Sequence, residues 1–434
     1  EKMSTYLRIE GESPESWAEF DSEAGETVCG VVVVGLWGAG SELHGVLQFS
    51  LTESGLECLT DEARQTIEVM AAQAGAALGN ARLVENMRAL FEGVVNLTVD
   101  AIDEKSPYTG DHCRRVPVLA ELLTELVCND RDGAYKDLSF TEDERYELKI
   151  AALLHDCGKV ATPIHIMDKA TKLETITDRA ELVRLRAEIL YRDAVIDALK
   201  GAGQEASGEE VEVDAASVAS ELAEASRLIH TANIGGEFMS EEKKSEIDAI
   251  ANRYRWTDRE GRAHGLLTDD ETKNLKISRG TLTDAERDII NNHVTTTIRL
   301  LERLPFPDSL KNVPSIAGAH HEHVDGTGYP HGLGHEDLSL QGRILGLADV
   351  FEALTAKDRP YKRGKTLSET FDILERMVEE GHIDGDLHRL FMREKIYLQY
   401  AVDYMSPEQI DDAHQADLEE YTLEHVPGLR LASR

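Results

Sequence analysis

The chain has 434 residues and carries 82 Asp and Glu against 46 Lys and Arg, which gives a formal net charge of −36. At this length we expect about two to four domains. The excess of acid argues against a general nucleic-acid binder and against adhesion to an anionic membrane surface, because both need many Lys and Arg contacts. A phosphate-bearing substrate is still compatible with the charge where metal or a local basic cluster lies at the site.

Cysteine usage and hydropathy indicate a cytoplasmic protein. No stretch reaches the roughly 18 apolar residues that span a bilayer, and no signal-peptide pattern is present, so we expect no membrane contact within this sequence. Because the sequence opens with Glu1 and not Met, we expect it to be a fragment. Its five cysteines form no C-x-x-C pair, which fits free thiols in a reducing compartment and argues against a Cys-type zinc site.

The first recognisable elements are two strands within residues 29–51. CGVVVVGLW is β-branched and bounded by glycine, HGVLQFSL alternates apolar and polar residues, and the turn at 38–41 predicts a hairpin. From residue 61 to 103 the apolar period is helical, and Pro107 ends it. A helix of this length is typical of a connector, and its apolar stripe predicts a parallel homodimer.

The rest of the chain predicts one helical domain with an insertion. Residues 108–165 and 275–405 predict helices separated by turns, and the region 168–274 between them predicts a helical insertion. Within the insertion, the Gly- and Ser-rich stretch at 201–213 predicts a mobile turn. The acidic segment after Pro407 is expected to be a peripheral tail.

Two histidines lie near the ends or on the faces of predicted helices. His155, followed by Asp156, comes directly after the apolar KIAALL, with Gly158 as the expected helix stop. His293 lies on the apolar face of a helix that Thr283 and Glu286 open as a capping box. Taken alone, each of these histidines is at least as often a satisfied core residue as a ligand.

A third group of histidines is harder to explain without a metal. His320 and His321 are adjacent and follow a short helix that Pro314 begins. Two buried charged imidazoles would repel, whereas a metal requires the neutral form. Asp349 is a carboxylate in an otherwise apolar helix, where it is costly to bury unless it is paired. Such a set of nitrogen and oxygen ligands suits iron or manganese, and less distinctively zinc or nickel.

Two further segments could face a substrate. DGTGYP at 325–330 predicts a tight exposed loop, which is either a plain turn or a wall of the pocket. DRPYKR at 358–363 gathers three basic residues in an acidic chain, which form either a solvated face or a phosphate clamp.

These motifs together resemble the HD-GYP family, metal phosphohydrolases that degrade cyclic dinucleotide second messengers in bacteria. The resemblance rests on HDCGK at 155–159, His293, HHEHVDGTGYP at 320–330 and ADVFEALTAKDRPYK at 348–362, preceded by KSPYTGDHCRRV with His112. It covers about 95–165 and 275–405. Residues 29–82, ending in QAGAALGNARLVEN, resemble the last strands and exit helix of a GAF sensor domain.

The resemblance implies a mainly α protein. A partial α+β GAF-like domain at 1–82 would lead through a connector helix at 83–106 into an all-α HD-GYP domain at 107–405. The helical insertion would occupy about 168–274, and an acidic tail would follow at 406–434.

The resemblance also implies a site with two metal ions per chain, iron first and manganese second. The implied metal ligands are His155, Asp156, His293, His320, His321 and Asp349. Asp156 would bridge the metals, and Lys159 would stabilise charge on the scissile phosphate. The loop Gly328-Tyr329-Pro330 would line the pocket, and Arg359 and Lys362 would hold the substrate's phosphate. A hydroxide between the ions would attack phosphorus in line with the leaving 3′-oxygen.

One departure from the family concerns the number of metals. Some members bind a third metal through a His at the position of His112 and a Glu four residues earlier. Here that earlier residue is Tyr108, so we expect two metals and keep His112 as a weaker candidate ligand.

The predicted activity is hydrolysis of cyclic di-GMP to linear pGpG, and to GMP where both bonds are cut. Three alternatives are left open. The enzyme could prefer cyclic GMP-AMP. The protein could be a receptor that binds a cyclic dinucleotide without turnover and signals through the connector helix or the insertion. It could be a nucleotidase acting on mononucleotides, against which the GYP segment argues.

Overall fold

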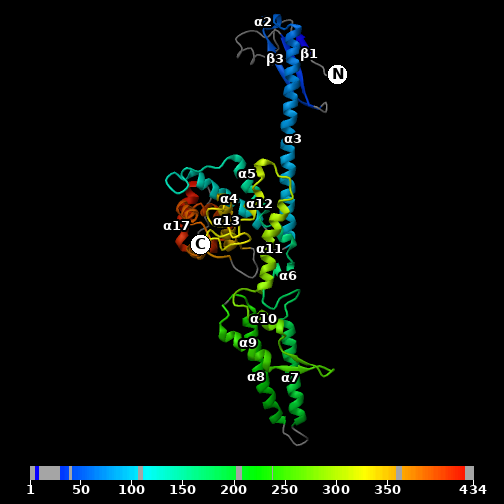
Figure 1. Ribbon diagram of the computed structural model, residues 1–434, viewed down its shortest axis with the longest axis vertical. Helices are drawn as coiled ribbons and strands as arrows, with labels where there is room; N and C mark the ends of the chain where they lie inside the picture. Colours follow the sequence, from blue (N-terminus) through cyan, green and yellow to red (C-terminus); the bar gives the residue numbers. More distant parts are fainter. Residues whose placement is uncertain are drawn as a thin grey trace. The chain divides into compact units, whose positions relative to one another are not determined.

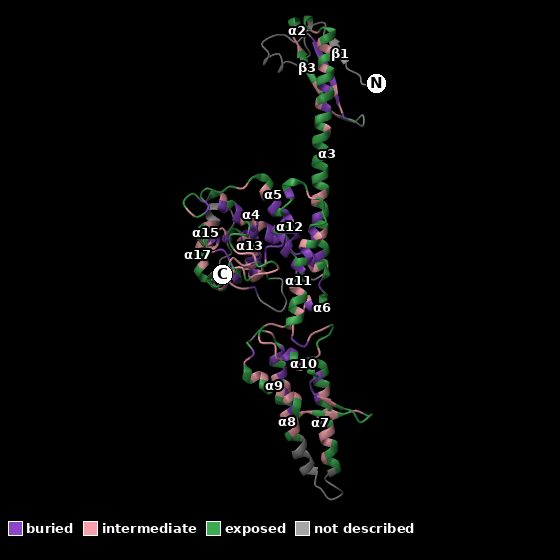
Figure 2. Ribbon diagram, viewed as in Figure 1, coloured by how far each residue is buried: buried purple, intermediate pink, exposed green. Residues whose placement is uncertain are grey.

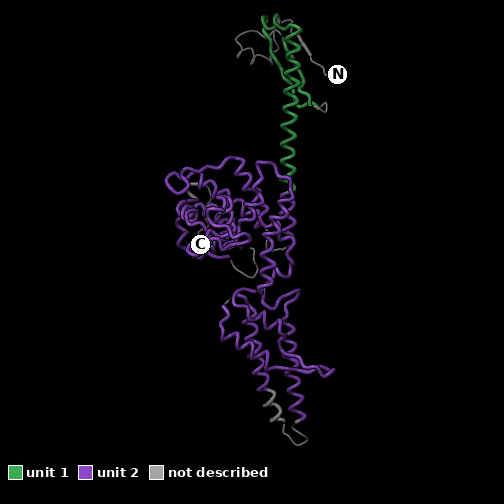
Figure 3. Tube along the Cα trace, in the orientation of Figure 1, with its two compact units in different colours: residues 1–94 green, residues 95–434 purple. Residues whose placement is uncertain are grey.

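The structure, a computed structural model, is mainly helical, as predicted (Figure 1). It describes residues 5–8, 30–38, 42–105, 111–201, 208–236, 238–357 and 364–425. The chain divides into two compact units, residues 1–94 and 95–434 (Figure 3). In these described ranges, no helix is both long enough and apolar enough to cross a membrane.

The first unit holds a small antiparallel sheet. Its strand order is β1 (Thr5–Arg8), β2 (Gly30–Trp37) and β3 (Leu43–Leu51), followed by the short helix α2 (Glu53–Glu57). The predicted hairpin is confirmed, since β2 pairs with β3 in the register Val34↔Leu47. β1 was not predicted. Val32, Val34 and Leu36 of β2 form the core of this unit together with Ala71 of the next helix.

That next helix, α3 (Asp61–Lys105), confirms the predicted long helix almost to the residue. Pro107, its expected terminator, lies outside the described residues. Two sets of apolar residues on α3 differ in burial, and Figure 2 shows the helix with buried and exposed stretches. One set is buried in the second unit, and the other is exposed at alternating spacings of four and three. The buried set is Val95, Val99 and Ile102; the exposed set is Leu83, Met87, Leu90, Val94 and Leu97. Pairing of the exposed set with a second chain stays a prediction.

The second unit is a helical domain whose helices converge on one site. Its helices before and after the insertion are α4 (His112–Asn129), α5 (Glu142–Leu154), η2 (Cys157–Ala161), α6 (Ile164–Met167), α11 (Asp284–Leu301), η4 (Asp308–Leu310), α12 (Val313–Ala317) and α13 (Leu340–Thr355). α13 packs on α4 and α5, and α12 packs on α5 and α11. The predicted capping box of α11 is present, with Thr283 and Glu286 bonded reciprocally.

The C-terminal helices cover the far end of α13. They are α14 (Leu367–Glu379), α15 (Gly385–Glu394), α16 (Tyr397–Tyr404), η5 (Pro407–Gln409) and α17 (Asp412–His425). The expected peripheral tail is in fact packed up to Leu418, which is 5% exposed. The Gln409 amide donates to the carbonyl oxygens of Thr355 and Lys365 at 2.8 and 3.0 Å. These bonds satisfy one main-chain acceptor at the end of α13 and one just before α14, so this segment belongs to the domain.

The insertion is helical, as predicted, and has its own core. Its elements are α7 (Ala180–Gly201), α8 (Gly208–Asn233), α9 (Glu241–Arg253), β4 (Arg255–Thr257), β5 (Ala263–Gly265) and α10 (Asp269–Leu275). α8 begins inside the stretch 201–213 that was predicted to be a turn, so that prediction is wrong from Gly208 onward; residues 202–207 lie outside the described chain. The β4–β5 hairpin was missed because strands of three residues are too short to show an alternating pattern.

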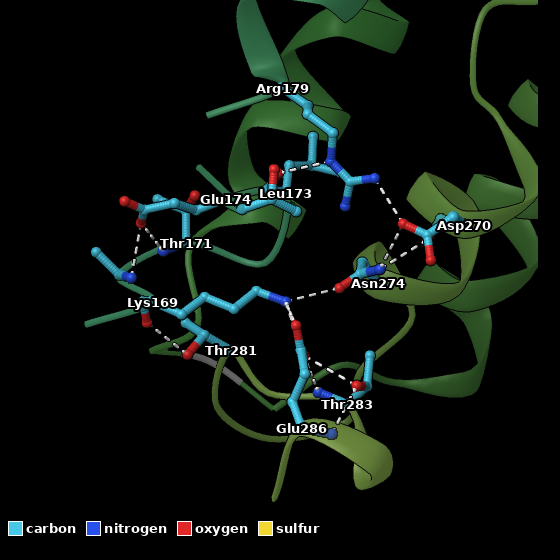
Figure 4. A network of polar contacts seen from close by, with 12 residues as sticks. Lys169, Thr171, Leu173, Glu174, Arg179, Asp270, Asn274, Thr281, Thr283 and Glu286 are labelled. Atoms are coloured by element: carbon cyan, nitrogen blue, oxygen red, sulfur yellow. Dashed lines mark hydrogen bonds and ion pairs between the residues drawn. The ribbon is translucent and has the colours of Figure 1, made fainter. Parts of the chain in front are cut away.

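A buried lysine ties both ends of the insertion to α11 (Figure 4). The Lys169 ammonium, 1% exposed, donates to Asn274 Oδ1 at 2.8 Å and to both carboxylate oxygens of Glu286 at 2.9 Å. The Thr281 hydroxyl donates to the carbonyl of Lys169 at 2.9 Å. Since Glu286 also caps the helix that carries His293, the insertion is anchored directly to an element of the site.

Replacing Lys169 with Met is expected to lower the free energy of unfolding by about 3 kcal/mol, because Glu286 and Asn274 would lose a buried charged partner. Urea unfolding measures this loss. The matched control is Lys200→Met on α7. Lys200 and its partner Asp197 are both exposed, so this change is expected to alter the free energy of unfolding by less than about 0.5 kcal/mol. Equal effects of the two substitutions would contradict the assignment.

Candidate metal centre

The predicted ligands come together from five parts of the second unit. His112 begins α4, His155 and Asp156 follow α5, His293 lies in α11, His320 and His321 follow α12, and Asp349 lies in α13. Every one of them is buried except His321, which is partly exposed. Burial of so many titratable groups in one place is costly unless they are paired or bind an ion.

Three of the rings are oriented in the same way. The Nδ1 atoms of His155, His293 and His320 each contact the carbonyl oxygen three residues earlier, at 2.7, 2.5 and 2.7 Å. A carbonyl only accepts, so Nδ1 carries a proton in each ring, and in a neutral imidazole Nε2 then presents the lone pair. These main-chain contacts therefore direct the three Nε2 atoms into the site.

These nitrogens face one another without a donor between them. His293 Nε2 lies 3.4 Å from His320 Nε2, and in neutral rings protonated on Nδ1 both atoms present lone pairs. His155 Nε2 is buried and makes no hydrogen bond. The carboxylate oxygens of Asp156 lie 3.3 Å from the Nε2 atoms of His155 and His293. Such a set of acceptors repels itself unless a cation lies among them, so these residues fit a metal.

The donor atoms form two groups, each within 4.8 Å: His293, His320 and His321, and His112, His155 and Asp156. This arrangement is consistent with a binuclear metal site. Asp156 belongs to one group and contacts the other, which is the position that a shared ligand requires.

His112, the weaker candidate ligand of the sequence analysis, contacts two of the other predicted ligands. Its Nε2 lies 3.4 Å from Asp156 Oδ2 and 3.2 Å from Asp349 Oδ1. Its Nδ1 bonds Glu352, a fully buried carboxylate whose second oxygen accepts from Arg115 Nε at 2.7 Å. Sequence reasoning missed Glu352, although it lies one turn after Asp349 in the same apolar helix and carries the same signal.

The electrostatics keep His320 and His321 neutral and Asp156 charged. Burial opposes protonation of His155, but Asp156 and Asp349 raise its pKa to about 9, and a metal would take the place of that proton. Burial, with His321 and His155 nearby, holds the pKa of His320 well below its ordinary value, and burial lowers the pKa of His321 to about 4. Burial opposes ionisation of Asp156, but Lys159, at 2.6 Å, and His155 hold its pKa well below the usual range. Neutral imidazole and ionised carboxylate are the forms that bind metal.

Gly158 has a different role from the helix stop that was predicted. α5 ends at Leu154, and Gly158 lies in η2. A Cβ at Gly158 would lie 2.0 Å from the carbonyl oxygen of His293, so only glycine lets η2 approach α11 this closely. The Thr297 hydroxyl fixes the contact by accepting from Gly158 N at 2.9 Å and donating to the carbonyl of His155 at 3.0 Å.

The GYP segment is a loop, as predicted, and lies beside the histidines. The Tyr329 ring stacks on His321 with ring centroids 4.9 Å apart, and a cis peptide bond joins it to Pro330. A Cβ at Gly328 would lie 2.3 Å from the main-chain nitrogen of His323, so the turn requires glycine. Glu322 accepts main-chain N–H bonds at 2.7 and 2.9 Å from the residues that follow the loop.

Three residues of the prediction lie outside the described chain. They are Arg359 and Lys362 of the basic run, and Tyr108. The phosphate clamp and the absence of a third metal therefore stay predictions.

Comparison with known proteins assigns the domain. Residues 267–387 match the family described as HD domain, a range that holds His293, His320, His321 and Asp349. The chain is 38% identical over 115 residues to a cyclic di-GMP phosphodiesterase of Pseudomonas aeruginosa, covering 26% of each chain. It is 40% identical over 322 residues to 3′3′-cGAMP-specific phosphodiesterase 3 of Vibrio cholerae, covering 74% of this chain and 41% of the relative.

A cyclic di-GMP phosphodiesterase of Thermotoga maritima is 40% identical over 101 residues, covering 23% of this chain and 27% of the relative. The chain thus spans between about a quarter and two-fifths of the length of these relatives. None of these matches identifies the N-terminal unit, so the GAF-like domain stays a prediction. The chain contains an HD domain related to those of the HD-GYP cyclic dinucleotide phosphodiesterases.

Proposed function

We propose that this protein is a metal-dependent phosphodiesterase that hydrolyses cyclic di-GMP to linear pGpG, and to GMP where both bonds are cut. The observation that carries the proposal is the pair of facing Nε2 atoms of His293 and His320, 3.4 Å apart, with Asp156 in contact with both ligand groups. With both rings neutral and protonated on Nδ1, these two atoms have no donor between them, and a cation would satisfy both.

The proposed ligands are His112, His155, Asp156, His293, His320, His321 and Asp349. Iron is favoured over manganese for this nitrogen and oxygen set. Two such ions would lower the pKa of a bound water and neutralise charge that develops on the phosphate. Lys159, whose ammonium lies 2.6 Å from Asp156, would place a positive charge beside the reacting phosphate. Tyr329 would close the pocket on the side of His321, where its ring already stacks.

A preference for cyclic GMP-AMP is the second candidate. It is favoured by the 40% identity, over 322 residues, to a relative named as specific for 3′3′-cGAMP. The two substrates share both phosphodiester linkages and differ in one base, so the same metal chemistry serves either.

The deciding experiment is anaerobic turnover of both cyclic dinucleotides, singly and in competition, by iron- or manganese-loaded protein with metal counted on the same samples. We expect turnover by the wild type and a loss of about a thousandfold or more in His155→Ala, since a metal ligand is removed. His230→Ala, an exposed histidine on α8, is the matched control and is expected to stay within about twofold of wild type.

The competing functions predict other results. Tight binding of a cyclic dinucleotide without product, in fully metallated protein, would assign a receptor. Turnover of mononucleotides alone would assign a nucleotidase.

A further inference from the structure

The last residue of α3 contacts the main chain directly behind the proposed catalytic residues. The Lys105 ammonium donates to the carbonyl oxygens of Lys159, Val160 and Thr162 at 3.0, 2.5 and 2.6 Å. An ammonium has three N–H groups, so all of them are used on this one segment. The carbonyls belong to the end of η2, where the last carbonyls of a helix lack intrahelical partners and favour a cation. The carbonyl of Lys159 also accepts from Thr162 N at 3.0 Å.

Lys105 is held in place by the packing of its own helix. Val95, Val99 and Ile102, at the end of α3, are 3%, 0% and 3% exposed within the second unit. They lie on one face at spacings of four and three, which is the face that α3 buries. The Lys105 side chain therefore extends from a helix end that is packed into the domain, and not from a surface loop.

The segment that Lys105 contacts carries Lys159. The Lys159 side chain leaves η2 to reach Asp156 Oδ2 at 2.6 Å. A second tether comes from α11, where Thr297 accepts from Gly158 N. η2 is a single short turn, so the position of Lys159 depends on these two tethers more than on the turn's own hydrogen bonds.

We propose that Lys105 is a positioning residue that holds η2 so that Lys159 lies at Asp156, and that α3 acts on the site through this contact. The activity part of this inference rests on the proposed function. The claim that Lys105 positions η2 rests on the three hydrogen bonds alone, and hydrogen exchange tests it without substrate.

The test compares Lys105→Met, which keeps the aliphatic stem, with Lys105→Arg, which keeps the charge. We expect Lys105→Met to lower kcat about tenfold while KM stays within about twofold and metal content is unchanged, because a displaced Lys159 weakens transition-state stabilisation more than binding. Lys105→Arg is expected to recover most of the loss. Lys149→Met, an exposed lysine on α5, is the matched control.

Hydrogen exchange supplies the readout that needs no substrate. The amides of Gly158, Lys159 and Thr162 are hydrogen-bonded, to Thr297 Oγ1 and to the carbonyls of Asp156 and Lys159. We expect them to exchange about tenfold faster in Lys105→Met than in wild type, with the rest of the domain unchanged.

The outcomes separate the two proposals. A wild type inert toward every cyclic dinucleotide would remove the proposed function, and the exchange measurement would still decide the positioning role. Unchanged exchange at these amides, or a kcat within twofold of wild type, would overturn the inference. A fall in metal content together with kcat would also overturn it, since Lys105 would then support the fold and not the position of Lys159.

Discussion

Asp156→Asn is expected to reduce phosphodiesterase turnover at least about a thousandfold and to lower the metal content below two ions per chain. The two carboxylate oxygens of Asp156 face different ligand groups, His293 on one side and His155 on the other, each at 3.3 Å. Asparagine keeps the shape but replaces one of these oxygens with an amide that donates and cannot bind a cation. Loss of about 4 kcal/mol of charge stabilisation corresponds to that thousandfold factor.

The measurement is kcat on the faster of the two cyclic dinucleotides, with metal counted by elemental analysis on the same protein. Asp143→Asn, an exposed carboxylate in the first turn of α5, is the matched control and should leave both quantities unchanged. A variant that keeps two ions and loses less than tenfold in kcat would show that Asp156 is not the shared ligand.

The sequence was sufficient for the parts of the site that depend on local chemistry. The adjacency of His320 and His321, and a carboxylate at Asp349 in an apolar helix, each indicated an ion before any fold was known. The capping box at Thr283 fixed the start of α11, and from it the face on which His293 lies. These signals involve residues close together in the chain, so a single sequence contains them.

The contacts missed by sequence reasoning join residues far apart. His112 and Glu352 are 240 residues apart, and no local pattern pairs them. The sequence predicts a helix stop at Gly158, because a glycine after a helix usually ends it, whereas its real constraint is the carbonyl of His293. The contact of Lys105 with η2 spans more than fifty residues and involves main-chain carbonyls, which leave no trace in side-chain composition.

Glu352→Gln is expected to lower metal affinity and kcat by about 10- to 100-fold, although Glu352 belongs to neither predicted ligand group. Burial opposes its ionisation, but His112 and Arg115 hold the pKa of Glu352 below its ordinary value, so it is a carboxylate. As a carboxylate it accepts from both partners and fixes the tautomer of His112. Glutamine would present one acceptor and one donor to His112 and Arg115, which both donate. Loss of a residue that orients a metal ligand typically lowers metal affinity or activity by about 10- to 100-fold.

Metal titration, followed by kcat at saturating metal, distinguishes a misoriented His112 ring from an unfolded metal site. We expect excess metal to restore part of the activity of Glu352→Gln, whereas an unfolded site would not respond. Glu125→Gln, an exposed carboxylate on α4, is the matched control.

The double variant of Glu352→Gln with His112→Ala tests whether Glu352 acts through His112. If Glu352 acts through the ring it orients, removing both groups costs no more than removing His112 alone, because the two behave as one unit. Additive losses would instead give Glu352 a role of its own.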